Sequence, residues 1–385
     1  MMIKKTATAL LLAIFLWNTA SSQVKNKTVT LHGYISSLQS VVFDSLSGPF
    51  QVDNLLHNRL NFRGYISDRI TLAAEFRNRL FTGDLVRLGS FYSDLIGFDP
   101  GFVDMSWNLA SEQSFLINTK VDRLWLDLHY DKFEVTLGRQ RINWGQTIVW
   151  NPNDIFNAYS FFDFDYIERP GCDAVRVQVF PSPSSVTEVA VKVDNMNDVT
   201  ASALYRFNKW SYDFQFLAGY FNSEDVVVGV GWSGAIGSVS FRGEGSWFEP
   251  FEEFPVSTGT LIFTTGIDKI FKDNSVAQFQ VMYCNNPLKL NNFNSLYSGD
   301  LSARDLAFSR FTAFGLYTWA VTPLLNLTLS AMWFPDLSGY FAGPSLDYSL
   351  SENVDFSLYW QHFNSIISGE RTRLNLGFLR VKYSF

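Results

Sequence analysis

Polar and apolar side chains alternate residue by residue along much of this chain, and this period restricts the fold more than any other feature. The pattern is clearest on either side of the tripeptide Ser67-Asp68-Arg69. The apolar set there is Leu60, Phe62, Ile66, Ile70, Leu72, Ala74 and Phe76, and the polar set is Arg59, Asn61, Arg63, Glu75, Arg77 and Arg79. A period of two predicts two β-strands joined by a tight turn.

Alternating segments continue to the C-terminus. Short polar or Pro/Gly breaks follow at 208–209, 233–237, 273–274, 322–323 and 351–353, whereas longer connections lie near 44–54, 82–120, 142–171, 249–258, 285–305 and 364–372. Short turns that alternate with longer loops are typical of an outer-membrane barrel with both termini in the periplasm. We therefore predict an all-β fold, a transmembrane antiparallel up-and-down barrel of about 18 strands, with 16 as the alternative.

The N-terminus predicts export. Lys4 and Lys5 precede an apolar stretch from Ala7 to Trp17, and small residues follow up to Ser22. The apolar part is too short to span a bilayer, so residues 1–22 are predicted to be a signal peptide and residues 23–385 the barrel. Without Lys4 and Lys5 the chain keeps 28 basic and 37 acidic residues, a net charge of −9, which argues against a nucleic-acid partner.

Composition agrees with a membrane barrel. Aromatic residues make up 17% of the chain and charged residues also 17%, below the usual value of about 25%. Mean hydropathy is only +0.02, and no apolar run after the signal is long enough for a transmembrane helix. The last residues, from Leu379 to Phe385, alternate once more and end on Phe. They resemble the final strand of outer-membrane proteins, which implies that Phe385 is a signal for the barrel-assembly machinery and that the chain resides in outer-membrane lipid.

One long stretch departs from the alternation. It runs from Gly138-Arg139-Gln140-Arg141 through Trp144-Gly145 and Asn151-Pro152-Asn153-Asp154 to Pro170-Gly171. It resembles a segment of Gram-negative porin-like outer-membrane proteins, including alginate-export-like barrels. The resemblance implies a porin-like channel, without naming its solute.

We predict that the loop near 142–171 folds inward and narrows the lumen, setting basic wall residues against acidic loop residues. Opposed charges in such a constriction would sort solutes by size and charge. The alternative is that these charges only pin the loop to the wall. The pore-lining candidates are Arg59, Arg63, Glu75, Arg77, Arg79, Arg139, Arg141, Asp154, Asp163, Asp165, Glu168, Arg169 and Arg176.

A barrel with an aqueous lumen predicts passive or weakly selective passage of small hydrophilic solutes. The basic character of the wall residues adds an expected preference for acidic solutes. A substrate-specific uptake or export barrel for carbohydrates is one alternative, with the aromatic run Tyr159, Phe161, Phe162, Phe164 and Tyr166 as a stacking track. These rings would more often pack the loop against the wall. The acidic loop residues lack the spacing of a calcium loop, so no metal site or cofactor is expected.

An outer-membrane lipid hydrolase is the other alternative. It would need Ser, His and an orienting polar residue in contact. The only histidines are His32, His57, His129 and His362, and none stands in a nucleophile motif. An enzyme is therefore not the preferred interpretation. The pairing of Cys172 with Cys284 and the formation of a homo-oligomer are left open by the sequence.

Overall fold

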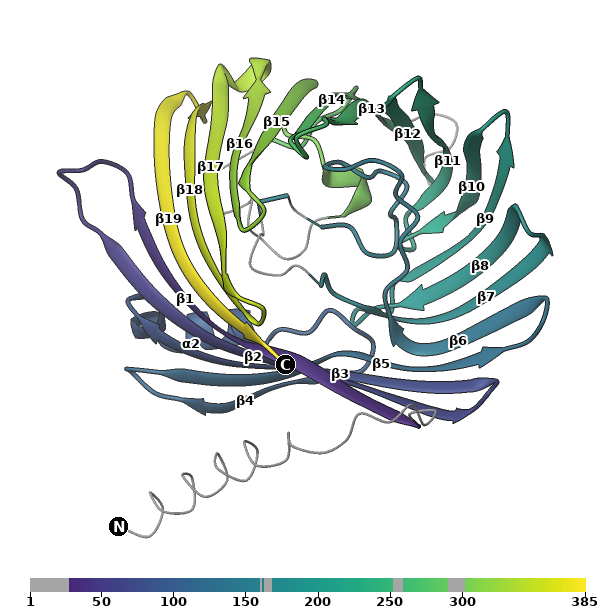
Figure 1. Cartoon of the computed structure of the whole chain (residues 1–385), viewed down its shortest axis with the longest axis horizontal. Helices are drawn as coiled ribbons and strands as arrows, with labels where there is room; N and C mark the ends of the chain where they lie inside the picture. The colour runs from purple at the N-terminus through teal and green to yellow at the C-terminus, as the bar shows by residue number, and fades with distance from the viewer. Residues whose placement is uncertain (1–27, 160, 163–167, 252–258, 290–301) are drawn as a thin grey trace, which may run out of the picture.

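The computed structural model describes residues 28–159, 161–162, 168–251, 259–289 and 302–385, which form a closed antiparallel barrel (Figure 1). Eighteen strands make the wall, so the alternative of 16 is wrong. They are β1 (Val29–Phe43), β2 (Gln51–Ser67), β3 (Ile70–Gly83), β5 (Leu116–His129), β6 (Phe133–Gln140), β7 (Cys172–Ser182), β8 (Ser185–Val193), β9 (Val199–Lys209), β10 (Tyr212–Phe221), β11 (Asp225–Ile236), β12 (Val239–Pro250), β13 (Thr260–Ile270), β14 (Val276–Cys284), β15 (Phe311–Thr322), β16 (Leu325–Phe334), β17 (Gly339–Ser351), β18 (Val354–Ile367) and β19 (Glu370–Ser384).

The register sorts the two predicted sets of side chains onto opposite faces of the wall. Leu60 pairs with Phe76, and Arg59 pairs with Arg77. The outer face carries exposed apolar residues, as expected of a surface that meets lipid, and the inner face carries the charges. None of the described helices is long and apolar enough to cross a membrane. The predicted signal peptide lies outside the described residues.

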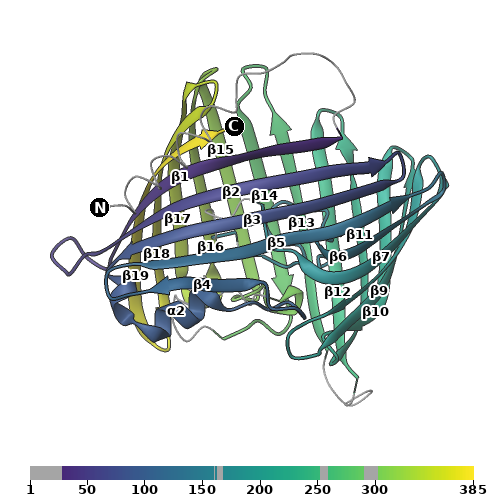
Figure 2. The same ribbon diagram turned by 90° about the horizontal axis from the view of Figure 1, so that it is seen from below.

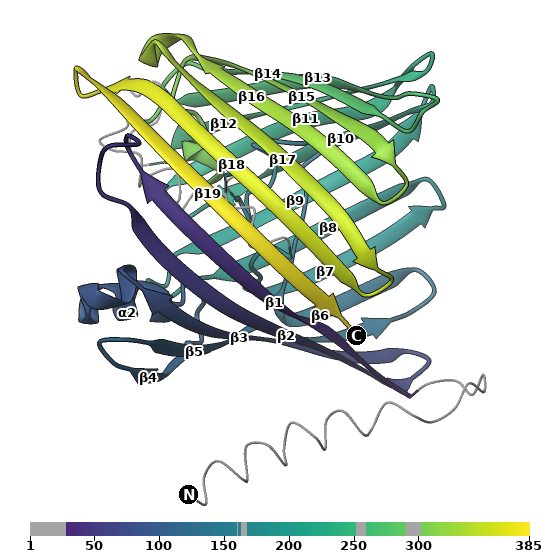
Figure 3. The ribbon, with the colours of Figure 1, turned by 60° about the vertical axis from the view of Figure 1, so that its left-hand side comes forward.

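The last strand closes the barrel on the first. β19 pairs with β1 over ten residues, including Leu38 with Arg380. Gly33 and Phe385 exchange both backbone hydrogen bonds, each with a donor–acceptor distance of 2.9 Å. The described start of the chain and its C-terminus therefore lie at the same end of the barrel (Figure 3).

One hairpin turns later than expected. The sequence placed this turn at Asn208-Lys209, but β9 continues to Lys209, and the turn is Trp210-Ser211. Both turn residues have positive φ, 55° and 62°. Such a two-residue turn matches the twist of the strands, although glycine or asparagine would be the usual choice. The predicted position of the turn was wrong because no glycine in the sequence marks the turn.

The segment between β3 and β5 contains η1 (Leu85–Leu88), α2 (Ser90–Gly97) and the short strand β4 (Ser106–Ser111). β6 ends at Gln140 and pairs with β5 only between Leu124 and His129, so β4 pairs with the remainder of β5 (Figure 2). Gly101 bridges to Asp194, just after β8. Residues 99–111, here the wall insert, thus fill the part of the wall that β6 and β7 do not reach. Two further helical turns are η3 (Ala303–Asp305) and η4 (Pro335–Leu337).

Candidate functional site

The connection between β6 and β7 crosses the barrel interior and contacts the opposite wall (Figure 1). Glu244 on β12 accepts backbone hydrogen bonds from Gln146 and from Asn153 in this loop, the latter at 3.2 Å. On β14, the Gln280 side chain accepts the Val149 N–H at 3.0 Å. A long loop needs such partners because its backbone groups are buried without a strand neighbour.

A buried tryptophan adds a second anchor on the neighbouring strands. The Trp144 indole donates to Glu188 on β8 at 2.5 Å, and Gln215 on β10 donates to the Trp144 carbonyl at 2.7 Å. Arg176 on β7 pairs with the same Glu188 at 3.0 Å. Arg176 therefore faces the interior, where its charge is neutralised by a loop-anchoring carboxylate.

A second loop, before β15, also packs inside. Leu306, Ala307 and Phe308 are buried in one apolar cluster with Trp144 of the first loop. Arg304 holds this loop to Asp225 at the start of β11, at 2.8 Å. The sequence marked 285–305 only as a long connection, because nothing in its pattern separates an inward loop from an external one.

Two aromatic residues of the first loop pack against the barrel wall and do not line a stacking track for sugar rings. Phe161 and Phe162 form edge-to-face contacts with Phe314, Phe341 and Phe363 on the wall. Phe162 is buried, and Phe161 is half-buried. This confirms the packing interpretation for these two rings. Phe164 and Tyr166, with Asp163 and Asp165, lie outside the described residues.

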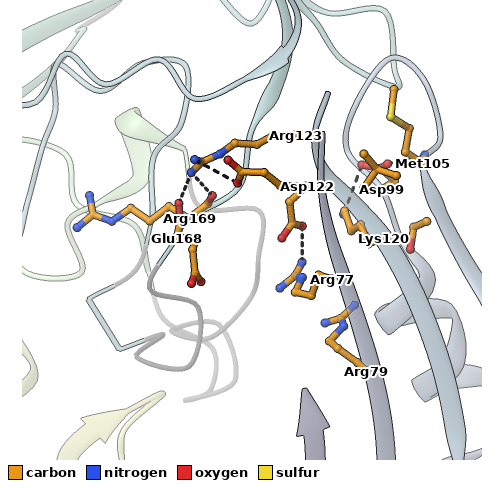
Figure 4. A network of polar contacts seen from close by, with 12 residues as sticks. Arg77, Arg79, Asp99, Met105, Lys120, Asp122, Arg123, Glu168 and Arg169 are labelled. Carbon is orange, nitrogen blue, oxygen red and sulfur yellow. Dashed lines mark hydrogen bonds and ion pairs between the residues drawn. The ribbon is translucent and has the colours of Figure 1, made fainter. Parts of the chain in front are cut away.

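Charged side chains gather instead on the wall of β2, β3 and β5. Arg59 is fully buried and lies 2.6 Å from Glu75 and 2.5 Å from Asp122. Asp122 also pairs with Arg77 at 3.2 Å (Figure 4). Two of the predicted pore-lining residues, Arg59 and Glu75, are thus committed to one buried ion network, in which each charge requires its partner.

Asp122 was not among the site residues predicted from the sequence, although it pairs with Arg59 on β2 and with Arg77 on β3. Glu75 pairs with Arg123 and Phe76 with Val121, so Asp122 is an extra residue in β5. Such a β-bulge redirects a side chain. The signal in the sequence was the adjacent pair Asp122-Arg123, which interrupts the alternation.

Three guanidiniums form an interior basic cluster, defined here as Arg123, Arg141 and Arg169. Arg123 donates to the Glu168 carbonyl at 2.5 Å and to the Arg169 carbonyl at 3.4 Å (Figure 4). Arg169 lies over the Tyr159 ring, 3.1 Å from its centroid. Within the described part of the chain, Arg141 makes no ion pair or hydrogen bond. Burial and the nearby Arg169 lower the pKa of Arg141 below its ordinary value.

Within this cluster, Arg123 is partly neutralised, since it lies 3.4 Å from Glu75. The carboxylate beside Arg141 and Arg169 is poorly satisfied. Asp154 is buried, and its Oδ1 accepts the Trp144 N–H at 3.3 Å, while Oδ2 has no hydrogen-bond partner. Burial raises the pKa of Asp154 to about 7, although Trp144, Arg141 and Arg169 lower it. Near neutral pH, Asp154 therefore offsets the cluster only in part.

The remaining predicted site residues are dispersed. Arg79 donates to Asn118 at 2.7 Å and to the Ile96 carbonyl, and Arg63 is exposed. The carboxylate of Glu168 accepts from the Tyr34 hydroxyl on β1 at 3.2 Å. The loop thus contacts β1 as well as the far wall.

Arg139 differs most from its predicted placement. The register sets it opposite Leu124 and Asp173, on the face where Val175 is exposed, rather than in the lumen row. It is 2% exposed and bonds Asp99 at 2.6 Å and Asp173 at 2.7 Å. It also donates to the Val103 carbonyl at 2.6 Å. Arg139 therefore holds the wall insert to β7. The local sequence did not indicate this contact, because Asp99 and Asp173 are distant from Arg139 in sequence.

Neither the cysteines nor the histidines form a reactive group in the described structure. Cys172 and Cys284 are buried free thiols. His362 contacts Asn375 and Tyr340, and His129 lies 3.5 Å from Glu134. Among the described residues, no histidine bonds a serine hydroxyl, and no group of three potential metal ligands occurs.

Sequence comparisons return no relative, since no protein-family model and no curated protein matches. Solved structures do match. OccAB4 of Acinetobacter baumannii gives a TM-score of 0.59 at 10% identity, covering 94% of this chain and 99% of that one. OccK11 (OpdR) of Pseudomonas aeruginosa gives 0.57 at 9% identity, covering 93% and 96%. The outer membrane protein opdK of the same organism gives 0.57 at 8%, covering 92% and 98%. This likeness shows the fold, an outer-membrane-type barrel.

Proposed function

We propose that this chain is a porin-like outer-membrane channel for passive or weakly selective passage of small hydrophilic solutes, acidic ones among them. A closed barrel with an apolar outside and a charged inside supports this function, because such a wall separates lipid from water. Two loops pack inside the barrel, and in the proposed channel they narrow the path of the solute. The observation that carries the acidic preference is the interior basic cluster, in which Arg141 and Arg169 lie near the buried Asp154, whose pKa burial raises to about 7.

The proposed selectivity arises from geometry rather than from net charge. The chain is acidic as a whole, yet Arg123, Arg141 and Arg169 gather at one place on the inward loop and the adjoining wall, beside Asp154. In an interior walled by protein, the field of a few charges is concentrated, and anions are attracted to the cluster. Arg141 contributes most directly, because the described residues around it do not neutralise it.

The test is the reversal potential in planar bilayers under a salt gradient. We expect the wild type to prefer anions, and Arg141→Gln to lower the anion-to-cation permeability ratio about two- to threefold. Arg87→Gln is the matched control, since Arg87 is exposed and its described ion pair is with the nearby Asp84. A wild type that prefers cations, with Arg141→Gln unchanged, would refute the proposal.

Liposome swelling tests the solute class. We expect dicarboxylates to enter faster than neutral sugars of similar size, and this difference to shrink in Arg141→Gln. Equal rates for both solutes would indicate an unselective pore.

A channel for carbohydrates is the second candidate. The resemblance of residues 138–171 to alginate-export-like barrels favours it, and acidic sugars would also suit a basic cluster. The packing of Phe161 and Phe162 against the wall argues against a long stacking track. Swelling with uronic acids and with neutral sugars of equal size separates the two candidates.

The proposal includes outer-membrane lipid around the barrel and the barrel-assembly machinery as a reader of Phe385. Phe385 is suited to that role because it is 42% exposed at the end of the closing strand. A homo-oligomer is compatible with this function and is not required by it.

A further inference from the structure

The outer face of β10 to β13 carries a groove that the transport function does not use. A cavity of about 360 Å³ lies there, and its main lining residues are Phe216, Val228, Val230, Gly245, Trp247 and Phe263. The register places it on the outside, because Gly245 pairs with Val230 and with Phe263, and both are exposed. It is therefore separate from the interior basic cluster.

The hollow lies beside a glycine of β12. Two residues before Gly245, the Trp232 ring covers Gly243, and two residues after it, Trp247 lines the hollow. A Cβ at Gly245 would lie 3.1 Å from the Phe263 ring and 3.3 Å from the Ile262 carbonyl. The Phe263 ring therefore closes one side of the hollow beside Gly245, and the other lining residues bound the rest.

The lining selects the kind of occupant. It is almost wholly apolar, and Ser246 nearby turns its hydroxyl inward to Pro152 and Asn153. A headgroup or a peptide would lose its hydrogen bonds to water without replacement. A second copy of the chain would need about 20 to 30 residues on each side, far more than line this groove.

We propose that the groove binds one acyl chain of an outer-leaflet lipid. The surface around it is continuous with the apolar outer face of the wall: Phe216 is 51%, Val228 49% and Val230 45% exposed. Trp247 lies three residues before the end of β12, on the side away from the chain termini, so the groove lies at the depth of the outer leaflet. This inference rests on placement of the barrel in the outer membrane, and it does not depend on solute selectivity.

The experiment uses the full mature barrel in nanodiscs that contain phosphatidylcholine with a photoreactive diazirine in its acyl chain. After irradiation, peptide mapping should show adducts concentrated on β11 to β13. Gly245→Leu, which fills the hollow, should reduce them at least threefold. Gly315→Leu is the matched control, because Gly315 pairs with exposed Phe279 on the outer face and has open space around it.

Heat-modifiable gel mobility would confirm that each variant is folded, and Gly245→Ala serves as a milder variant if Leu prevents assembly. Adducts spread evenly around the barrel, or unchanged adducts in the filled variant, would overturn the proposal. Crosslinks between two protein chains at this groove would overturn it in favour of a second copy. Failure of the ion-selectivity test would leave this inference intact, since the two sites are on opposite faces.

Discussion

At the scale of single residues, Asp154 is the clearest case of a carboxylate whose ionised form is destabilised by burial. It is buried beside the interior basic cluster with one carboxylate oxygen unpaired, and burial raises its pKa to about 7. The folded chain therefore binds the proton more tightly than the unfolded chain. By linkage, the contribution of Asp154 to the stability of the folded barrel is most favourable below about pH 4 and becomes less favourable as the pH rises towards 7.

Asp154→Asn should remove this dependence. Relative to wild type, the variant should gain stability above pH 7, by an upper limit of about 4 kcal/mol, and little at pH 4. The loss of the heat-modifiable gel form, followed against temperature at both pH values, measures it. Asp68→Asn, at an exposed turn, is the control. A gain that is equal at both pH values would contradict the assignment.

At the scale of the element, the wall insert depends on one buried arginine. Arg139 neutralises Asp99 and Asp173, which come from the insert and from β7. Arg139→Ala would remove the cation paired with Asp173 and leave Asp99 with Lys120, 3.4 Å away. Breaking a buried pair in this way costs about 3–5 kcal/mol. We expect residues 99–111 to become sensitive to protease and to exchange amide hydrogens faster.

The control for this variant is Arg87→Ala, which removes an exposed arginine from the same connection. Arg139→Lys should be intermediate, because an ammonium keeps the charge but not the paired geometry that reaches both carboxylates. Full protease resistance of the Ala variant would show that the backbone pairing of β4 with β5 alone holds the insert.

The elements also show what the sequence could predict and what it could not. The strands were predictable because lipid on one side and water on the other impose a strict alternation, as between Leu60 and Arg59. Burial of Arg59 and the outward placement of Arg139 were not, since both depend on partners distant in sequence, such as Asp122 and Asp99. Inward packing of residues 306–308 is likewise a tertiary contact, which local periodicity does not encode.

At the scale of the whole molecule, closure joins the two ends of the chain. Phe385 is bonded to Gly33 through both backbone groups. Removal of Phe385 deletes this bonded pair and the terminal aromatic, so we expect several-fold less folded barrel in the outer membrane. Quantitative gels of the heat-modifiable form in membrane fractions would measure it; Tyr383→Phe, which keeps an aromatic ring on the same strand, should assemble normally.

The pairing of β1 with β19 also determines how late in biogenesis the barrel can close. β1 is made first and can pair early with β2, the next strand in the chain. Its other partner, β19, becomes available only when synthesis and export are finished. During that interval its free edge offers a row of unpaired amides, and such an edge recruits other chains. We therefore expect β1 to need a protein that shields this edge until β19 arrives to pair with it.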